Sequence, residues 1–538
     1  MTSARGAEQP AATMVAVPHV PLPVGRMRAS LLGPPLPAFA TLWQTGGRRG
    51  VTAGICVVLP LVAGHLVGQP VLGTAASLGA LTAIYGHALP YRRRAVVVAG
   101  VGAALAVAAG LGALAGGHPV VLSLGAGAVA TAATAASGVW RTGPPGPLGA
   151  MLVYGGASAL GTAPADLGPF LLAAVGGAAL AWCGCMLPCL WDPTGPERRA
   201  VRAAGRAVER AATATGSAGP RSGAVAHAVR TADAAVGWAG ARRDSALAAE
   251  LREIEQRFLR ALPPGVTEIA PLPAGSAPAV PPEPHWWDHA LVATSLRIGV
   301  GATVAALAAT ALGLQNPYWA ATTAVAVQLG TDARHTRDRA VNRAAGTVLG
   351  VLLAWLIISA GLPVGAEIAL VGMLQFAVEL LVAHQYGLAV AVITPMVLIQ
   401  VHIGVPGRPG STLVAERLAE TLIGIVLGVL VGLCLFVRAG SRRLPATVDR
   451  AAAAAVAAAR CPGGTEADRR LRQALEALGE VMTAARTELF PPPATTAWLG
   501  RGRSVADLGW GLLGARARGD DALAAALASR IGAGPPSS

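Results

Sequence analysis

Residues 95–116 read AVVVAGVGAALAVAAGLGALAG, a run without a single charged side chain. A helix needs about 20 mostly apolar residues to cross the hydrocarbon core of a bilayer. Only 13% of the 538 residues are charged, whereas a soluble domain usually carries about 25%. The mean hydropathy of the chain is +0.54. The sequence therefore predicts an all-α, polytopic membrane protein.

Similar runs gather in two blocks of six, separated by an arginine-rich region, and predict about 12 membrane helices in total. The first block contains the runs 50–69, 71–90, 95–116, 118–139, 147–163 and 165–190, and the second contains 290–313, 316–331, 344–361, 363–383, 386–403 and 411–437. We therefore expect five parts: a partly disordered N-terminal cytoplasmic segment (1–48), two membrane blocks (49–190 and 290–437), a central cytoplasmic region with a Pro-rich linker (191–289) and a C-terminal helical region (438–538).

The positive charge is placed unevenly along the chain. The net charge is +14, and every basic residue other than histidine is arginine, because the sequence contains no lysine. Clusters at Arg92–Arg94, Arg198–Arg202 and Arg337–Arg343 fall on one side of a twelve-helix arrangement, and Arg408 departs from this pattern. By the positive-inside rule both termini lie in the cytoplasm and the protein spans the cytoplasmic membrane. The partner that this charge predicts is the lipid bilayer, not a nucleic acid.

The two blocks resemble internal repeats. Gly54 and Gly301 stand 247 residues apart, and at a similar offset Gln69-Pro70 corresponds to Asn316-Pro317. Six helices per block would give both repeats the same orientation, a parallel duplication of the kind found in transporters.

The soluble regions are predicted to be helical. Helical spacing of apolar residues occurs in 197–212, 240–262, 446–460 and 466–490, whereas 263–284 is rich in proline and predicts a linker. A phosphate-binding loop needs a lysine that the chain lacks, and no zinc-protease or nucleophile-elbow motif is present. We therefore expect neither an enzyme nor a bound cofactor or metal.

The segment Asn316-Pro317-Tyr318-Trp319 is the first candidate site. Proline in the first turn after an asparagine is a favourable helix start, and the positive end of that helix attracts anions. Tyr318 and Trp319 could stack on an aromatic solute. The alternative is an interfacial aromatic belt with a helix cap.

Charged residues inside apolar runs are the second candidate set, because such residues are costly to bury in a membrane and are often functional. They are Arg297, Glu379, Glu416, Arg417 and Glu420. Glu416 and Glu420 are four residues apart and share one helix face, beside Arg417, which could pair with either or bind a substrate carboxylate. Glu379 lies at the opposite depth, so a pair with Arg417 is not expected. The alternative for each residue is an interfacial helix end.

The stretch that joins the second and third helices of the second block is the third candidate. Arg343 and its neighbouring arginines could gather anions or simply anchor the loop. Gly346, Thr347 and Gly350 follow, and the two glycines form a small-residue pair that permits close helix packing.

The sequence NPYWAATTAVAVQLGTDARHTRDRAVNRAAGTVLG, residues 316–350, resembles the fusaric acid resistance protein-like (FUSC) family, whose relatives include aromatic acid exporters. The matching residues are Pro317, Tyr318, Trp319, Ala320, Arg343, Gly346, Thr347 and Gly350. The first block has Pro70-Val71-Leu72-Gly73 at the corresponding place and lacks the aromatic pair. The resemblance implies efflux of small aromatic or carboxylate compounds.

These features predict a secondary transporter that exports small organic anions, such as aromatic carboxylates, under the proton gradient. A passive anion channel is one alternative. A non-transporting membrane scaffold or regulatory protein is another. The substrate itself, and whether the chain forms a homo-oligomer, stay open.

Overall fold

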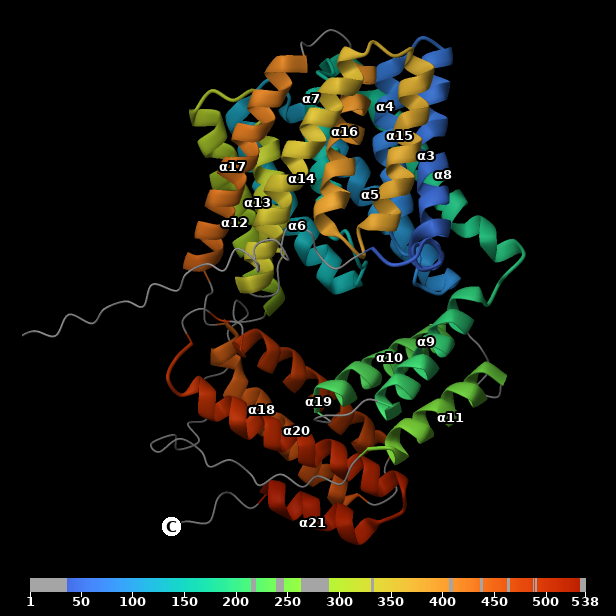
Figure 1. Ribbon diagram of the computed structural model, residues 1–538, viewed down its shortest axis with the longest axis vertical. Helices are drawn as coiled ribbons and strands as arrows, with labels where there is room; N and C mark the ends of the chain where they lie inside the picture. Colours follow the sequence, from blue (N-terminus) through green and yellow to red (C-terminus); the bar gives the residue numbers. More distant parts are fainter. Residues whose placement is uncertain are drawn as a thin grey trace, which may run out of the picture.

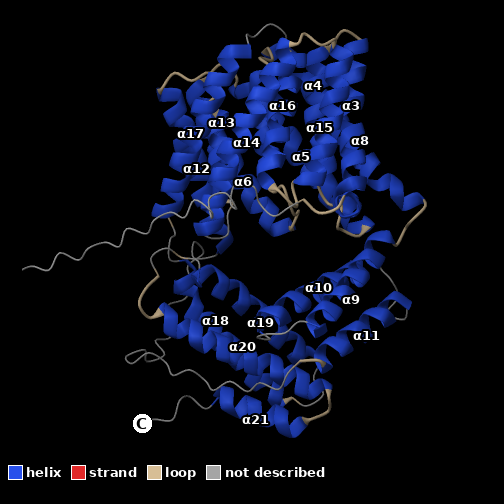
Figure 2. Ribbon diagram, viewed as in Figure 1, coloured by secondary structure: helices blue, strands red, loops and turns tan. Residues whose placement is uncertain are grey.

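A computed structural model describes residues 36–213, 219–238, 246–262, 290–329, 333–405, 410–435, 439–461, 465–486, 488 and 491–532. Within these ranges the regular elements are helices and no strand occurs (Figure 2). The predicted linker 263–284, Arg408 and the first 35 residues of the N-terminal segment lie outside the described residues.

The helices form an apolar bundle and a separate helical domain on one side of it (Figure 1). The first part of the bundle contains α2 (Phe39–Leu42), the π-helical turn η1 (Trp43–Gly47), α3 (Arg48–Leu66), α4 (Pro70–Ala80), the 3-10 turn η2 (Leu81–Ile84), α5 (Tyr91–Ala115), α6 (Pro119–Trp140), α7 (Leu148–Ala159) and α8 (Leu167–Met186). The second part contains α12 (Ala290–Ala311), α13 (Tyr318–Gln328), α14 (Ala333–Ser359), α15 (Val364–Leu381), α16 (Tyr386–Gly404) and α17 (Gly410–Cys434).

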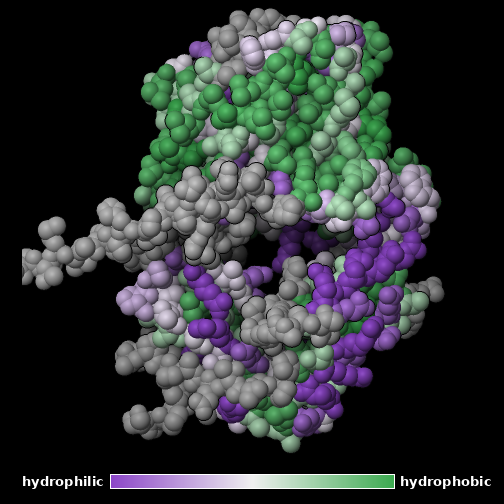
Figure 3. Space-filling view, in the orientation of Figure 1, coloured by the Kyte–Doolittle hydropathy of each residue, from purple (hydrophilic) through white to green (hydrophobic). Residues whose placement is uncertain are grey.

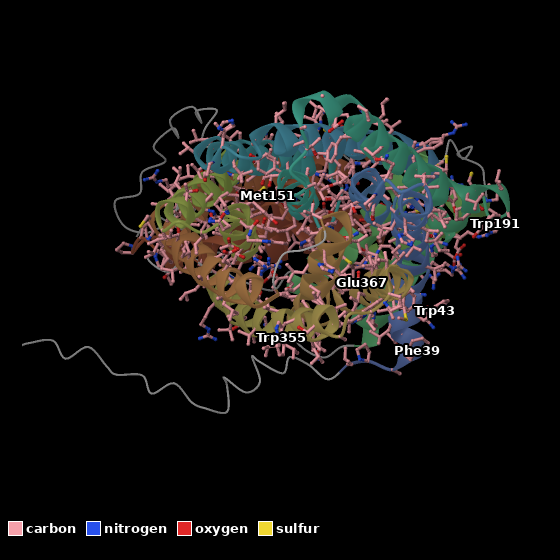
Figure 4. The ribbon with its side chains drawn as sticks, turned by 90° about the horizontal axis from the view of Figure 1, so that it is seen from above. Phe39, Trp43, Met151, Trp191, Trp355 and Glu367 are labelled. Atoms are coloured by element: carbon pink, nitrogen blue, oxygen red, sulfur yellow. The ribbon has the colours of Figure 1, made fainter. Side chains whose placement is uncertain are left out.

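The face of the bundle seen in Figure 3 is largely apolar. Large side chains such as Val96 and Leu172 are 72% and 74% exposed, which is unfavourable in water over a contiguous surface but favourable against lipid tails. Viewed along the bundle, Met151 lies in the interior, whereas Trp43, Trp191 and Trp355 lie at the periphery (Figure 4). The predicted all-α membrane class is confirmed.

The predicted number of membrane helices is not confirmed. Among the described residues nine helices are long and apolar enough to cross a bilayer. The predicted helix 71–90 is shorter because the chain leaves the helix at Tyr85, which is extended, and Gly86, which has a φ of 75°. The predicted helices 147–163 and 316–331 shorten to α7 and α13, with 12 and 11 residues.

Small residues allow the helices to approach closely. A Cβ on Gly79 of α4 would lie 1.9 Å from the carbonyl oxygen of Ala174 on α8, and one on Gly112 of α5 would lie 2.1 Å from that of Tyr154 on α7. Van der Waals contact between such surfaces holds helices together in lipid, where hydrophobic drive is weak.

The first helix begins before residue 48, which corrects the predicted boundary of the N-terminal segment. Helical structure runs from Phe39 through η1 into α3. The ring of Trp43 lies 6.2 Å from that of Phe376 on α15, and Gly46 lies against the backbone of Glu379. This packing against α15 stabilises a segment whose own sequence is too polar to indicate a membrane helix.

The helical domain combines the central and C-terminal regions in one core. Its helices are α9 (Gly195–Thr213), α10 (Gly219–Trp238), α11 (Ala246–Arg260), α18 (Ala439–Arg460), α19 (Thr465–Arg486), α20 (Thr495–Ala517) and α21 (Asp521–Gly532). Phe258 of α11 meets Trp510 of α20 edge-on at 6.0 Å, and Arg472 of α19 forms an ion pair with Glu255 of α11. The sequence did not predict α10, α20 or α21, whose alanine- and glycine-rich faces give weak apolar periodicity.

Candidate functional site

The start of α13 is held by two carboxylates of α17. The backbone N–H of Asn316 donates a hydrogen bond of 3.0 Å to Glu420, and its side-chain amide donates one of 3.3 Å to Glu416. The sequence had suggested that Asn316 caps α13 with its side chain, but it does not. Pro317 occupies the N-cap position without a side-chain cap bond. The four-residue spacing of the two glutamates on one helix face makes this double contact possible.

Arg417 lies between these two glutamates in sequence but turns to an aromatic ring. Its guanidinium carbon is 3.7 Å from the centre of the Trp319 ring, a cation–π arrangement. Arg417 is 2% exposed, and its Nε and Nη1 atoms have no hydrogen-bond partner among the described residues. Among the described residues, no ion pair joins Arg417 to Glu416 or Glu420.

Arg343 of α14 brings a second positive charge to the same place. It is 5% exposed, and its Nε atom has no partner among the described residues. Its charge repels that of Arg417, whereas the charge of Glu420 attracts it. A buried charge is costly unless it is paired and hydrogen-bonded. Two neighbouring guanidinium groups whose Nε donors have no partner in the described part of the chain are therefore suited to hold an anion.

The aromatic pair faces the first block. The rings of Tyr318 and Trp319 have centres 4.8 Å apart. A Cβ on Gly155 of α7 would lie 2.0 Å from the Tyr318 ring, so only glycine at this position lets α7 cover the tyrosine. The residues that the structure brings together are Asn316, Pro317, Tyr318, Trp319, Arg343, Glu416 and Arg417, and we call them, with Glu420, the anion cluster.

The first block has a buried arginine at a comparable place, but its surroundings differ. Arg94 of α5 donates hydrogen bonds to the carbonyl oxygens of Gly86, His87, Leu89 and Cys185 at 3.1, 2.7, 2.9 and 3.2 Å. These bonds fix the loop between η2 and α5. Arg94 therefore has a structural role, whereas the Nε donor of Arg343 has no partner among the described residues.

Two predicted residues lie away from the anion cluster. Glu379 forms an ion pair with Arg49 of α3 and accepts a hydrogen bond of 3.1 Å from Gln375. As expected, it makes no contact with Arg417. Arg297 lies at the other end of α13, where its guanidinium donates to the backbone carbonyl of Gln328 at 3.5 Å.

The predicted packing residues lie between α14 and α16. A Cβ on Gly346 would lie 2.4 Å from the carbonyl oxygen of Gly387, and one on Gly350 would lie 2.8 Å from that of Ala391. Thr347 is fully buried beside them. This close contact positions Arg343, one turn earlier on the same helix.

Sequence reasoning considered Glu420 only as the neighbour of Glu416 on one helix face, and it did not consider Gln328. Glu420 is 1% exposed, and one of its carboxylate oxygens has no partner among the described residues. The spacing from Glu416 was a usable signal for Glu420. For Gln328, the signal is an amide that ends an otherwise apolar helix.

The fold defines a helical membrane protein, and part of the chain is similar to a known family. Residues 304–431, which contain the whole anion cluster, match the family described as Fusaric acid resistance protein-like. The uncharacterized membrane protein YvaC of Bacillus subtilis (strain 168) is 34% identical over 163 residues, which cover 30% of this chain and 26% of that relative. The match therefore spans about a quarter of the relative's length. No solved structure matches the chain.

Residues 304–431 are thus similar to the fusaric acid resistance protein-like family, and the resemblance seen in residues 316–350 is confirmed.

Proposed function

We propose that the protein is a secondary transporter that exports small organic anions, such as aromatic carboxylates, across the cytoplasmic membrane. The observation that carries this proposal is the pair Arg343 and Arg417, which are buried and have N–H donors without a partner among the described residues. Arg417 also lies over the Trp319 ring. A carboxylate would accept bonds from both guanidinium groups and balance their charges. The family match supports transport as the general role.

The aromatic part of the substrate would lie against Trp319 and Tyr318. Indole and phenol rings offer flat apolar surfaces on which another ring can stack. The first block would close over this ring through α7, which already covers Tyr318. Substrate would thus enter between the two blocks.

Glu416 and Glu420 are the proposed proton carriers. Both accept hydrogen bonds from Asn316, the residue at which the chain enters α13. Protonation would remove the negative charge that these groups place beside Arg417 and weaken their hold on Asn316. Proton binding would therefore be linked to the position of α13. Glu379 is neutralised by Arg49, and we propose that it joins α15 to α3 and does not bind the anion.

The arrangement as two six-helix blocks is also proposed, with the first block beginning at Phe39 in place of residue 49 and the second at 290–437. Its support is the packing pattern: α4 contacts α8 as α13 contacts α17, and α5 contacts α7 as α14 contacts α16. The first helix of each block also packs against the fourth of the other, α3 on α15 and α12 on α6. The short α4 and α13, each 11 residues, occupy the same place in the two blocks. In this proposal the helical domain and both termini lie in the cytoplasm.

The test is uptake of radiolabelled benzoate and related aromatic carboxylates into inverted membrane vesicles, with and without a pH gradient. We expect gradient-dependent uptake by the natural protein and by Arg92→Met, which removes an exposed arginine, and none by Arg417→Met. Uptake that needs no gradient would favour the passive channel. Absence of uptake for every anion, with the protein present in the vesicles, would contradict transport.

A further inference from the structure

The far end of α13 carries a second buried polar group. Gln328, the last residue of the helix, is 3% exposed, and neither atom of its side-chain amide has a hydrogen-bond partner among the described residues. A buried amide without partners is destabilising, and an apolar residue of the same size would avoid the cost. A side chain kept in this state is a candidate for binding a ligand.

Three helices surround this amide. A Cβ on Gly301 of α12 would lie 1.8 Å from Nε2 of Gln328, and Gly432 of α17 borders its aliphatic part. The two glycines leave room for the glutamine side chain between α12, α13 and α17. The amide therefore lies inside the second block and not on its lipid-facing surface.

Arg297 brings positive charge to the same place. It lies one turn before Gly301 on α12, and one of its terminal nitrogens donates to the backbone carbonyl of Gln328. Its Nε atom is buried and has no partner among the described residues. A guanidinium N–H and a carboxamide N–H together are donors that a carboxylate accepts. The nearby Arg339 does not compete for this role, because it donates to Ala326 and stacks on Tyr386.

The two polar places stand at opposite ends of one short helix. α13 spans 11 residues, with Asn316 just before its start and Gln328 at its end. At about 1.5 Å per residue, this length separates the two places by roughly 16 Å. The end with Gln328 faces the helical domain, because α12 begins on that side and α13 returns to it (Figure 1).

We propose that Gln328 and Arg297 form a second binding site for the transported anion, on the side of the bundle that faces the helical domain. This inference rests on the proposed transport function. The anion would bind first at Gln328 and Arg297 and then at Arg417 and Arg343, so that α13 lies along its path.

The test uses vesicles of both orientations, distinguished by whether trypsin reaches the arginine-rich helical domain, with radiolabelled benzoate as the probe. For Gln328→Leu we expect the half-saturating concentration to rise roughly tenfold, the effect of one lost bond to a charged group. The rise should occur only when benzoate is supplied on the domain-facing side. Arg417→Met, in contrast, should abolish uptake from both sides.

Thermal unfolding separates a binding role from a structural one. Because leucine removes two unpartnered polar atoms, Gln328→Leu should unfold at the same temperature as the natural protein or higher. The matched control is Gln400→Leu, which removes a buried amide of α16 that donates to Ser77 at 3.0 Å. It should leave half-saturation unchanged from both sides.

An unchanged half-saturation in Gln328→Leu, with normal uptake by the natural protein, would overturn the second site and leave the proposed transport intact. An equal rise from both sides together with a lower unfolding temperature would also overturn it, because the glutamine would then be structural. Absence of benzoate uptake by the natural protein from either side would instead contradict the proposed function, and the second site with it.

Discussion

Arg94→Met should destabilise the protein far more than Arg343→Met, although both replace a buried arginine in a comparable helix. Arg94 donates to four carbonyl oxygens, and bonds from a charged donor contribute roughly 1.5 kcal/mol or more each. Removing the buried charge offsets roughly 2 kcal/mol of that loss. The expected net destabilisation is therefore about 4 kcal/mol. Arg343 has no such set of bonds among the described residues, so its replacement should cost little stability.

The assay is thermal unfolding of the purified protein in lipid nanodiscs, followed by tryptophan fluorescence. For a chain of this size, about 4 kcal/mol corresponds to a fall of roughly 3–4 °C in the unfolding temperature. Arg92→Met is the matched control, because Arg92 is exposed on the same helix. If Arg94→Met unfolded at the same temperature as Arg92→Met, the distinction between a structural and a binding arginine would be refuted. The same would follow if Arg343→Met lowered the unfolding temperature as much as Arg94→Met.

Three further predictions concern other parts of the chain. Burial lowers the pKa of His87 to about 4, whereas the unfolded chain takes up the proton near pH 6.5. The free energy of unfolding should therefore be highest above pH 6.5 and fall by up to about 3 kcal/mol as the pH drops towards 4. In unfolding scans, His87→Gln should remove this pH dependence. Phe258→Ala removes a ring packed on Trp510 and should cost about 3–5 kcal/mol in the helical domain, measured as faster trypsin cleavage there. Gly346→Ala should force α14 away from Gly387 and lower the unfolding temperature, whereas Gly365→Ala, which has open space around it, should not.

Each of these predictions has a contradicting result. If His87→Gln left the pH dependence of unfolding unchanged, the protonation of His87 would not be linked to unfolding. Trypsin resistance retained in Phe258→Ala would mean that the central and C-terminal helices do not depend on this contact. Equal unfolding temperatures for Gly346→Ala and Gly365→Ala would contradict the close approach of α14 and α16.

The membrane class could be predicted from the sequence because repeated uncharged runs of about 20 residues are typical of helices that cross a bilayer. Helix lengths could not be predicted as well. α13 has 11 residues within an apolar run of 316–331, because the chain leaves the helix at Leu329 and not where the apolar residues stop. A hydropathy average over many residues does not show where a helix ends inside an apolar run. A proline or a glycine with positive φ, such as Gly86, marks a helix end at one position.

The structure brings most of the predicted residues together, but the sequence did not predict their contacts. The family signature and the spacing of Glu416 and Glu420 indicated which residues to consider. The contact between Asn316 and these glutamates joins positions about 100 apart in sequence, and the partner of Glu379 is 330 residues away. Contacts at such separation depend on how helices pack, which local spacing does not encode.

The central claim is that an organic anion binds between Arg417 and Arg343 with its ring on Trp319. A structure of the protein in lipid nanodiscs with 4-iodobenzoate, determined by electron cryo-microscopy, tests it most directly. We predict ligand density with the carboxylate at the two guanidinium groups and the iodine beyond the indole ring. At a saturating concentration, density elsewhere in the bundle, or none at Arg417 and Arg343, would contradict the account.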